Sequence, residues 1–197
     1  MSDDERARWD LRYASGEYVP RAHPSPFLLE WLDRIPVGRA LDVATGTGRN
    51  AFALAEAGYE VDAVDISEVA IDRARAEAQR RGLDVNWWVA DLDSDALPGR
   101  DYGLITVLRY HNPRLWAQLE SALAPDGWVL IEHHLRTHRS DVGGPRDDAF
   151  RLAPGELLQA FDDLRVVHYS ESVEPADNAD TRLVIARLVA CAGDPGW

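Results

Sequence analysis

The stretch LDVATGTGRNAFALAEAGYEVDAVD, residues 41–65, decides the fold. It begins as an apolar strand, turns at the glycines of residues 45–48, continues as a helix and ends in a second apolar strand at Asp65. This order is typical of a βαβ unit that binds a nucleotide-like ligand where the helix presents its first backbone N–H groups. The glycines allow the backbone to approach such a ligand closely. The Asp65 carboxylate, at the tip of the second strand, is placed to accept hydrogen bonds from ribose hydroxyls.

The turn alone leaves two classes of cofactor open. The spacing of Gly46, Gly48 and Ala51 also fits the G-x-G-x-x-A fingerprint of nicotinamide dinucleotide sites. A nicotinamide-dependent reductase would need a substrate domain or a catalytic Tyr-x-x-x-Lys, and this chain contains no lysine. Motifs elsewhere in the sequence are needed to decide between the two classes of cofactor.

Strands and helices alternate around this unit, which predicts a mostly parallel sheet with helices on both faces. We expect strands at about 39–43, 60–65, 84–90, 102–108 and 128–133. We expect helices at about 2–14, 25–36, 48–57, 67–82 and 112–125. Because the fifth strand is almost wholly apolar, we expect it to be buried on both faces.

The pattern changes after residue 134. A loop at 138–145 and a short helix near 154–162 precede two further strands, at about 164–170 and 181–190. An acidic linker over 171–180 joins them. Two successive strands with no helix between them predict an antiparallel pair at one edge of the sheet.

The composition fits one α/β domain over residues 1–197. We divide it into an N-terminal helical segment over the cofactor site (1–36), a cofactor-binding core (37–134) and an acceptor-side part (135–197). The formal charge is −13, and all 21 basic residues are arginine. Binding to nucleic acid needs a basic face, and because the sequence shows none, we expect no nucleic-acid partner. The acidic N-terminus and the lack of a long apolar run predict a cytoplasmic protein with no membrane contact.

Cysteine and histidine usage narrows the chemistry further. The single Cys191 excludes an internal disulfide. The six histidines show no metal-ligand spacing, so we expect no metal. We expect a monomer or a weak homodimer.

Several motifs resemble those of class I S-adenosylmethionine-dependent methyltransferases. In the D-x-A-x-G-x-G turn, Asp42 stands four residues before Gly46, where a dinucleotide site normally has no acid. Residues 89–92, 101–107 and 123–128 match later motifs in the family's order. The resemblance implies a Rossmann-like seven-stranded sheet in the order 3-2-1-4-5-7-6, with the last strand antiparallel.

Further segments resemble one subgroup of small bacterial and archaeal methyltransferases. These segments are WDxRY at residues 9–13, residues 48–67 and residues 143–161. The subgroup is similar to tellurite-resistance methyltransferase and to thiopurine or thiol S-methyltransferases. This resemblance implies S-adenosylmethionine as cofactor, S-adenosylhomocysteine as product and a small-molecule acceptor.

The resemblance also implies the cofactor-binding residues at the strand tips. In it, Asp65 binds the ribose, Asp91 meets the adenine amino group and Asn50 helps to hold the methionine end. Trp9 and Tyr13 either close over the cofactor or only staple the N-terminal helix to the body, and we favour closure. The predicted set is Trp9, Tyr13, Asp42, Ala44, Thr45, Gly46, Gly48, Asn50, Asp65, Ile66, Asp91, Leu92 and Leu108.

The residues after the fourth strand are candidates for the acceptor side. An arginine directly after an apolar strand is costly to bury unpaired, so Arg109 either binds an anionic acceptor or forms an ion pair with Asp91 or Glu132. Tyr110 follows it. From strand five, His133 is a candidate base, although we favour one of His133 and His134 in the sheet and the other on the surface.

Two later segments complete the predicted acceptor side. Arg182 begins the last strand, and the resemblance places an arginine of that strand near the acceptor. The loop 142–146 is either a mobile lid whose Arg146 reaches the substrate or an ordinary connection.

The sequence therefore predicts an enzyme that transfers a methyl group to a small molecule by in-line displacement without a metal. The expected acceptor is a soft nucleophile, either a thiol or a metalloid oxyanion such as tellurite. Two alternatives are a nicotinamide-dependent reductase and a non-catalytic S-adenosylmethionine-binding protein.

Overall fold

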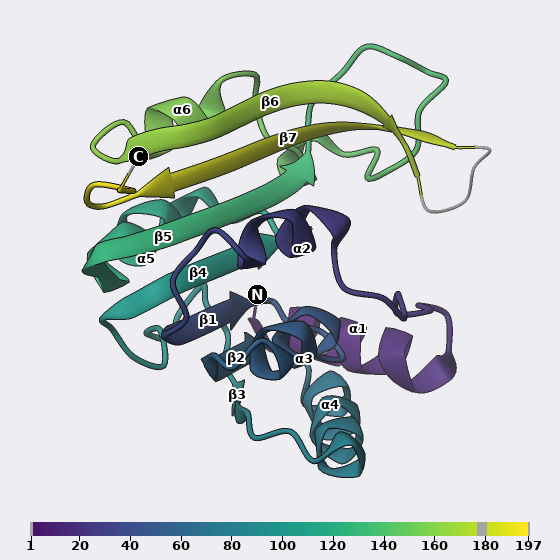
Figure 1. The fold of residues 1–197 in the computed structure, drawn as a ribbon. Coiled ribbons are helices and arrows are strands. Elements are labelled where there is room, and N and C mark those ends of the chain that lie inside the picture. The colour runs from purple at the N-terminus through teal and green to yellow at the C-terminus, as the bar shows by residue number, and fades with distance from the viewer. Residues whose placement is uncertain (1, 177–180, 197) are drawn as a thin grey trace.

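The computed structural model describes residues 2–176 and 181–196. At its centre is one seven-stranded sheet with the strand order β3-β2-β1-β4-β5-β7-β6 (Figure 1). The strands are β1 (Arg39–Val43), β2 (Glu60–Asp65), β3 (Asn86–Val89), β4 (Tyr102–Leu108), β5 (Leu123–His134), β6 (Arg165–Pro175) and β7 (Arg182–Cys191). β1 to β5 pair in parallel, whereas β7 is antiparallel to both of its neighbours. The predicted fold class and strand order are confirmed.

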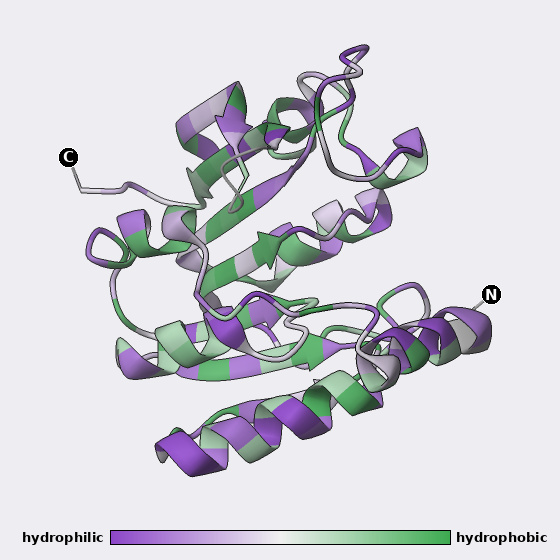
Figure 2. Ribbon diagram, turned by 90° about the vertical axis from the view of Figure 1, so that its right-hand side faces the viewer, coloured by the Kyte–Doolittle hydropathy of each residue, from purple (hydrophilic) through white to green (hydrophobic). Residues whose placement is uncertain are grey.

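Helices cover both faces of the sheet. They are α1 (Ser2–Ser15), α2 (Pro26–Leu32), α3 (Arg49–Glu56), α4 (Glu68–Arg81), α5 (Trp116–Ala122) and α6 (Glu156–Ala160), with 3-10 turns at Pro113–Leu115 and Asp148–Phe150. α2 and α3 bury Trp31 and Leu54 against one face, and α5 and α6 bury Leu119 and Leu157 against the other. Apolar residues run through the strands, and polar and apolar bands alternate along the helices (Figure 2). The sheet is therefore the middle layer of one core.

The predicted cap of α4 is present, and that of α2 is only partly so. Ser67 Oγ accepts a hydrogen bond of 3.1 Å from the Ala70 N–H at the start of α4. Ser25 stands at the N-cap of α2, but its Oγ makes no capping bond. Its backbone N–H instead donates to Asn50 Oδ1 at 2.9 Å, which ties the segment before α2 to the start of α3.

The last strands differ most from the sequence-based prediction. β6 does not end near residue 170 but continues to Pro175, so residues 171–175 are strand and not linker. Within this extension, Glu174 forms a 2.6 Å ion pair with Arg187 on β7. The positive charge of Arg187 balances the negative charge of Glu174 on this edge strand. The rest of the predicted linker, residues 177–180, lies outside the described residues.

The other strand boundaries differ by a few residues. β5 begins at Leu123 and not at 128, because Leu123 already pairs with Tyr102 on β4. β3 is shorter than predicted. Among the described residues, no helix has the length and apolar character needed to cross a membrane.

Candidate functional site

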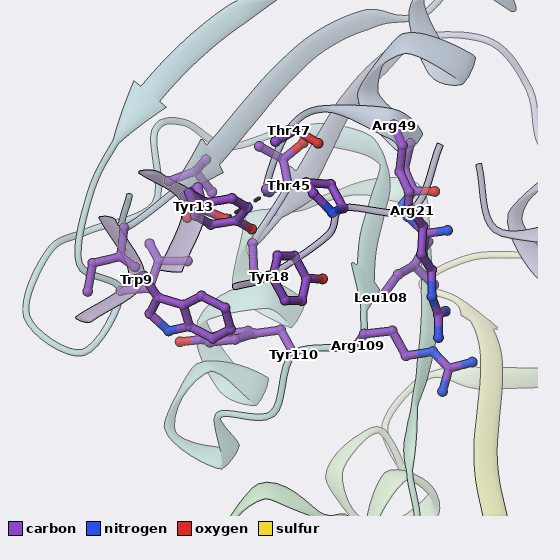
Figure 3. Close-up of a pocket in the computed structure, with 18 of the residues that line it drawn as sticks. Trp9, Tyr13, Tyr18, Arg21, Thr45, Thr47, Arg49, Leu108, Arg109 and Tyr110 are labelled. Atoms are coloured by element: carbon purple, nitrogen blue, oxygen red, sulfur yellow. Dashed lines mark hydrogen bonds between the residues drawn. The ribbon is translucent and has the colours of Figure 1, made fainter. Parts of the chain in front are cut away.

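One pocket of about 390 Å³ opens at the carboxyl ends of the parallel strands. Aromatic side chains stand on one side of it and arginines on the other (Figure 3). The structure places most of the predicted site residues on its wall. These are Trp9, Tyr13, Ala44, Thr45, Gly46, Asn50, Asp65, Ile66, Asp91, Leu92, Leu108, Arg109, Tyr110 and His133.

Asp65 holds the glycine turn in place from the tip of β2. Its carboxylate accepts hydrogen bonds from the backbone N–H of Gly46 at 2.8 Å and of Ser67 at 2.9 Å. Burial raises the pKa of Asp65 to about 6, although both N–H groups act in the opposite direction. Each carboxylate oxygen keeps a second lone pair, so Asp65 retains acceptor capacity on the pocket wall.

Asp42 supports the same turn from below and does not line the pocket. Its buried carboxylate accepts a 2.6 Å hydrogen bond from Thr45 Oγ1 and a 2.8 Å bond from Thr106 Oγ1. Burial raises the pKa of Asp42, and the two hydroxyl donors oppose this. The acid of the D-x-A-x-G-x-G motif therefore positions the turn and has no direct access to a ligand.

The turn needs glycine for two reasons. Gly46 and Gly48 have φ angles of 56° and 86°, which favour glycine. A Cβ on Gly48 would lie 2.8 Å from the rings of Phe52 and Trp87, so Gly48 packs α3 onto the sheet and is not part of the pocket wall. A Cβ on Gly46 would lie 2.8 Å from Tyr13 Oη, in the path of the residue that covers the turn.

Asp91 carries an unused acceptor on the pocket wall. Its Oδ1 accepts a 3.0 Å hydrogen bond from the Asp93 N–H. Its Oδ2 is buried and has no hydrogen-bond partner among the described residues. A buried carboxylate oxygen without a donor favours a ligand that brings one.

Three aromatic residues from α1 and the loop after it cover the turn. The rings of Trp9, Tyr13 and Tyr18 contact one another at centroid distances of 5.3 to 6.0 Å. Burial raises the pKa of Tyr13 far above its usual range, which keeps its hydroxyl neutral. Trp9 and Tyr13 thus reach the pocket, as the closure hypothesis requires, and they also anchor α1.

Several wall residues were not predicted from the sequence. They include Tyr18, Val19, Pro20 and Arg21, which lie in a segment that we predicted only as a loop. The remaining ones are Glu5, Val64, Ala90 and Asp93, whereas Thr47, Arg49, His134 and Pro145 lie in segments that the sequence already indicated. A loop has no hydrophobic periodicity, so only the aromatic and basic character of Tyr18 and Arg21 hinted at a role.

Arg109 forms the ion pair with Glu132 that the sequence allowed and also reaches the pocket. Its Nη2 forms a 3.1 Å ion pair with Glu132, and its side chain also lines the pocket. Its φ angle of 70° is uncommon for a residue with a side chain, which indicates a conformation imposed by the surroundings. Its Nε is buried without a partner among the described residues.

The two histidines at the end of β5 differ in exposure, since His133 is buried whereas His134 is partly exposed and lines the pocket. His133 Nε2 contacts the Phe150 carbonyl at 2.9 Å, so Nε2 carries the proton and Nδ1, which is buried without a described partner, carries the lone pair. His134 Nε2 lies 3.4 Å from Arg109 Nη1 and accepts from it. The preferred prediction of one histidine in the sheet and one on the surface is met in part, because His133 is buried and His134 is partly exposed, although the loop at Gly144 lies against its ring.

Two predicted acceptor-side residues lie outside the pocket wall. Arg182 is exposed at the start of β7, its backbone pairs with Val142 and it does not line this pocket, so its place near the acceptor stays a prediction. Arg146 is also exposed, and only Pro145 of that loop reaches the wall. The backbone bond of 2.8 Å from the Gly143 N–H to the Arg182 carbonyl fixes the loop to β7.

Comparison with known proteins places this pocket in a family. Residues 40–127 match the model of a methyltransferase domain. The chain carries a methyltransferase domain with the class I fold. The predicted resemblance is thereby confirmed.

Individual proteins that are similar to this chain in sequence or in fold are consistent with the match. The ribosomal protein L11 methyltransferase of Symbiobacterium thermophilum is 30% identical over 66% of this chain. The ubiquinone biosynthesis O-methyltransferase of Shewanella pealeana is 25% identical over 87% of this chain and 75% of its own length. The crystal structure of TehB from Haemophilus influenzae superposes with a TM-score of 0.75 at 21% identity, over 92% of this chain and 66% of that one.

The chain spans only 44% of the length of the L11 methyltransferase. The match with that relative is therefore a match of methyltransferase domains. The family supports the predicted cofactor, S-adenosylmethionine.

Proposed function

We propose that the protein transfers a methyl group from S-adenosylmethionine to a small-molecule acceptor with a soft nucleophile, a thiol or a metalloid oxyanion. One observation supports this above all others. In a methyltransferase domain, the Asp65 carboxylate stands at the tip of β2, bonded to the Gly46 N–H of the turn, on the wall of the pocket.

The wall residues fit the chemistry of this cofactor. Asp65 offers lone pairs to ribose hydroxyls, and the buried Oδ2 of Asp91 offers one to an amino group. Gly46 leaves the backbone open where a side chain would meet Tyr13. When bound, S-adenosylmethionine supplies a methyl carbon that its positive sulfur already activates.

The protein's own contribution is alignment and the exclusion of water. Trp9, Tyr13 and Tyr18 cover the turn from one side. Tyr110 also lines the pocket, and Asn112 Nδ2 donates to its hydroxyl at 3.3 Å. These groups would position the reactants and limit the access of water to them.

The histidines favour a soft nucleophile. The lone pair of His133 is buried at Nδ1, and that of His134 accepts from Arg109. Burial lowers the pKa of His133 to about 4 and that of His134 to about 3. A hard nucleophile such as an alcohol needs a strong base in reach, whereas a thiolate or an oxyanion needs only to be positioned.

Ligand binding tests the cofactor part of the proposal. We expect S-adenosylhomocysteine to raise the unfolding temperature of the protein and NADPH to leave it unchanged. Stabilisation by NADPH alone would identify a reductase. A screen of small thiols, tellurite, selenite and amines, with release of S-adenosylhomocysteine as readout, then tests the acceptor. Slow release that no acceptor accelerates would leave a non-catalytic binding protein.

A further inference from the structure

The pocket has ends of opposite charge. The acidic side chains on its wall are Glu5, Asp65, Asp91 and Asp93, from α1 and the tips of β2 and β3. The arginines on its wall are Arg21, Arg49 and Arg109, which stand together on the other side (Figure 3). The acidic end suits a ligand rich in hydroxyl and amino donors, and the basic end suits a ligand group of a different kind, one that is not a donor.

The boundary between the two ends falls between consecutive residues. Burial raises the pKa of Tyr110 to about 12, and the negative charges of Asp93 and Glu5 add to this. Burial lowers the pKa of Arg109, and the positive charges of Arg21 and Arg49 lower it further, although Glu132 opposes them. Tyr110 therefore lies closer to the acids of the wall, whereas Arg109 has Glu132 as its strongest opposing charge and lies near Arg21 and Arg49.

The acids that pair with Arg109 and Arg187 lie behind the pocket wall and not on it. Glu132 is the ion-pair partner of Arg109, but its other oxygen binds Arg187 at 2.7 Å, so two cations share one carboxylate. Arg187 also pairs with Glu174 at 2.6 Å, on the far side from the pocket wall. Neither acid lines the pocket, whereas Arg109 does.

The polar groups at this end are hydrogen-bond donors. Arg109 has N–H groups and no acceptor. His134 accepts from Arg109 at Nε2, so its proton is on Nδ1. His133 keeps its lone pair buried at Nδ1. This end of the pocket therefore carries positive charge and hydrogen-bond donors, whereas its own acceptor atoms are already bonded or buried. Such a surface matches a ligand group that is negatively charged and accepts hydrogen bonds.

We infer that the methyl acceptor carries an oxyanion group, a carboxylate or an inorganic oxyanion, and that Arg109 is the residue that selects it. This inference rests on the proposed function, since it names the substrate class of the same pocket. Besides the N–H groups directed at Glu132 and His134, Arg109 Nη1 and Nη2 each carry a second N–H that can donate to an oxyanion. The nucleophile is then held at a fixed distance from the anchored anion.

The test compares two probes of equal shape, 3-mercaptopropionate and the neutral 3-mercaptopropionamide, with tellurite as a third. Calorimetry measures their binding to protein saturated with S-adenosylhomocysteine, which reads out affinity without turnover. We expect the carboxylate to bind at least tenfold more tightly than the amide. In Arg109→Gln we expect the carboxylate and the amide to bind with nearly equal affinity, while the affinity for the amide is unchanged. Arg109→Lys should keep part of the preference for the carboxylate.

Two further variants separate charge recognition from folding. Arg21→Gln removes a second cation of the same wall and should reduce the preference without touching the Glu132 pair. Arg114→Gln is the matched control, because Arg114 is exposed and outside the pocket wall. Preferential binding of tellurite that depends on Arg109 would assign the anion to the inorganic source and still support the inference.

Three results would overturn the inference. They are equal binding of carboxylate and amide together with no Arg109-dependent binding of tellurite, a preference that survives both Arg109→Gln and Arg21→Gln, and no binding of either anion to protein that binds S-adenosylhomocysteine. Failure of S-adenosylhomocysteine itself to bind would instead overturn the proposed function. The two failures are thus distinguishable in one set of titrations.

Discussion

The carboxylate of Asp10 on α1 accepts a 2.6 Å hydrogen bond from the hydroxyl of Ser67. It also accepts a 3.2 Å bond from the Val69 N–H in the first turn of α4. Ser67 is itself the N-cap of α4, so an acid from the start of the chain completes this cap. The contact docks α1, and with it Trp9 and Tyr13, over the cofactor pocket.

We predict that Asp10→Ala loosens α1 and weakens cofactor binding. Loss of a capping acceptor should lower the free energy of unfolding by about 0.5–2 kcal/mol. Urea unfolding measures this change, and calorimetry measures the affinity for S-adenosylhomocysteine. Asp72→Ala is the control, since Asp72 is exposed on α4 and pairs only with Arg75. Equal effects of the two substitutions would show that Asp10 has no special role.

A second prediction concerns the acid at the tip of β2. Asp65→Ala should weaken binding of S-adenosylmethionine by about 1.5–3 kcal/mol, because hydrogen bonds to a charged group are lost. Glu60→Ala, an exposed site at the opposite end of the same strand, should leave the affinity unchanged. Calorimetry on both variants decides the point, and an unaltered affinity in Asp65→Ala would remove this residue from the site.

The fold was predictable because its signals are local. The βαβ unit, the cap at Ser67 and the apolar β5 each lie within one short stretch of sequence. The extension of β6 was not predictable in this way. Its acidic residues look like a linker until Glu174 meets Arg187, and that pairing exists only once β7 lies beside β6.

The site was predictable to the same extent. The turn and the strand tips follow from the topology, so Asp65 and Asp91 were placed correctly on the wall. Arg182 does not line the wall, because the direction of a side chain on β7 depends on the register with β5 and β6, which local sequence does not fix. The surroundings of His134 were not predictable either, because the loop at Gly144 covers part of its ring only in the folded chain.

A third prediction uses two glycines that share a backbone conformation. Gly46 and Gly16 both have positive φ angles, of 56° and 75°. Alanine at either should cost about 1–2 kcal/mol of stability from the left-handed conformation. Only at Gly46 would the new Cβ also meet Tyr13 Oη, at 2.8 Å, whereas at Gly16 it meets nothing within 4 Å.

Gly46→Ala should therefore lose affinity for S-adenosylhomocysteine, and Gly16→Ala should not. The double variant Gly46→Ala with Tyr13→Phe removes the clashing oxygen and should recover part of the lost stability. Thermal unfolding and calorimetry on the four proteins measure both quantities. If Gly16→Ala weakens binding as much as Gly46→Ala, the close approach of Tyr13 to the turn is not what the site requires.

Two buried groups give the stability of the protein opposite dependences on pH. Burial lowers the pKa of His133 from 6.5 to about 4, so its contribution to stability is full above pH 6.5 and falls as the pH falls towards 4. Burial raises the pKa of Asp65 from 3.8 to about 6, so its contribution is full below pH 3.8 and is lost as the pH rises through 6. The two effects partly cancel between these values.

Replacing His133 should leave the contribution of Asp65 to the pH dependence of stability without the opposing contribution of the histidine. Between pH 8 and pH 5, we expect His133→Gln to lose about 2 kcal/mol less free energy of unfolding than the unmodified protein does. Glutamine can still donate to the Phe150 carbonyl, so the substitution removes the titrating group and keeps a donor. His138→Gln, at an exposed loop position, should retain the original pH dependence. Urea unfolding at both pH values measures the difference, and parallel behaviour of all three proteins would mean that His133 does not remain neutral in the folded state.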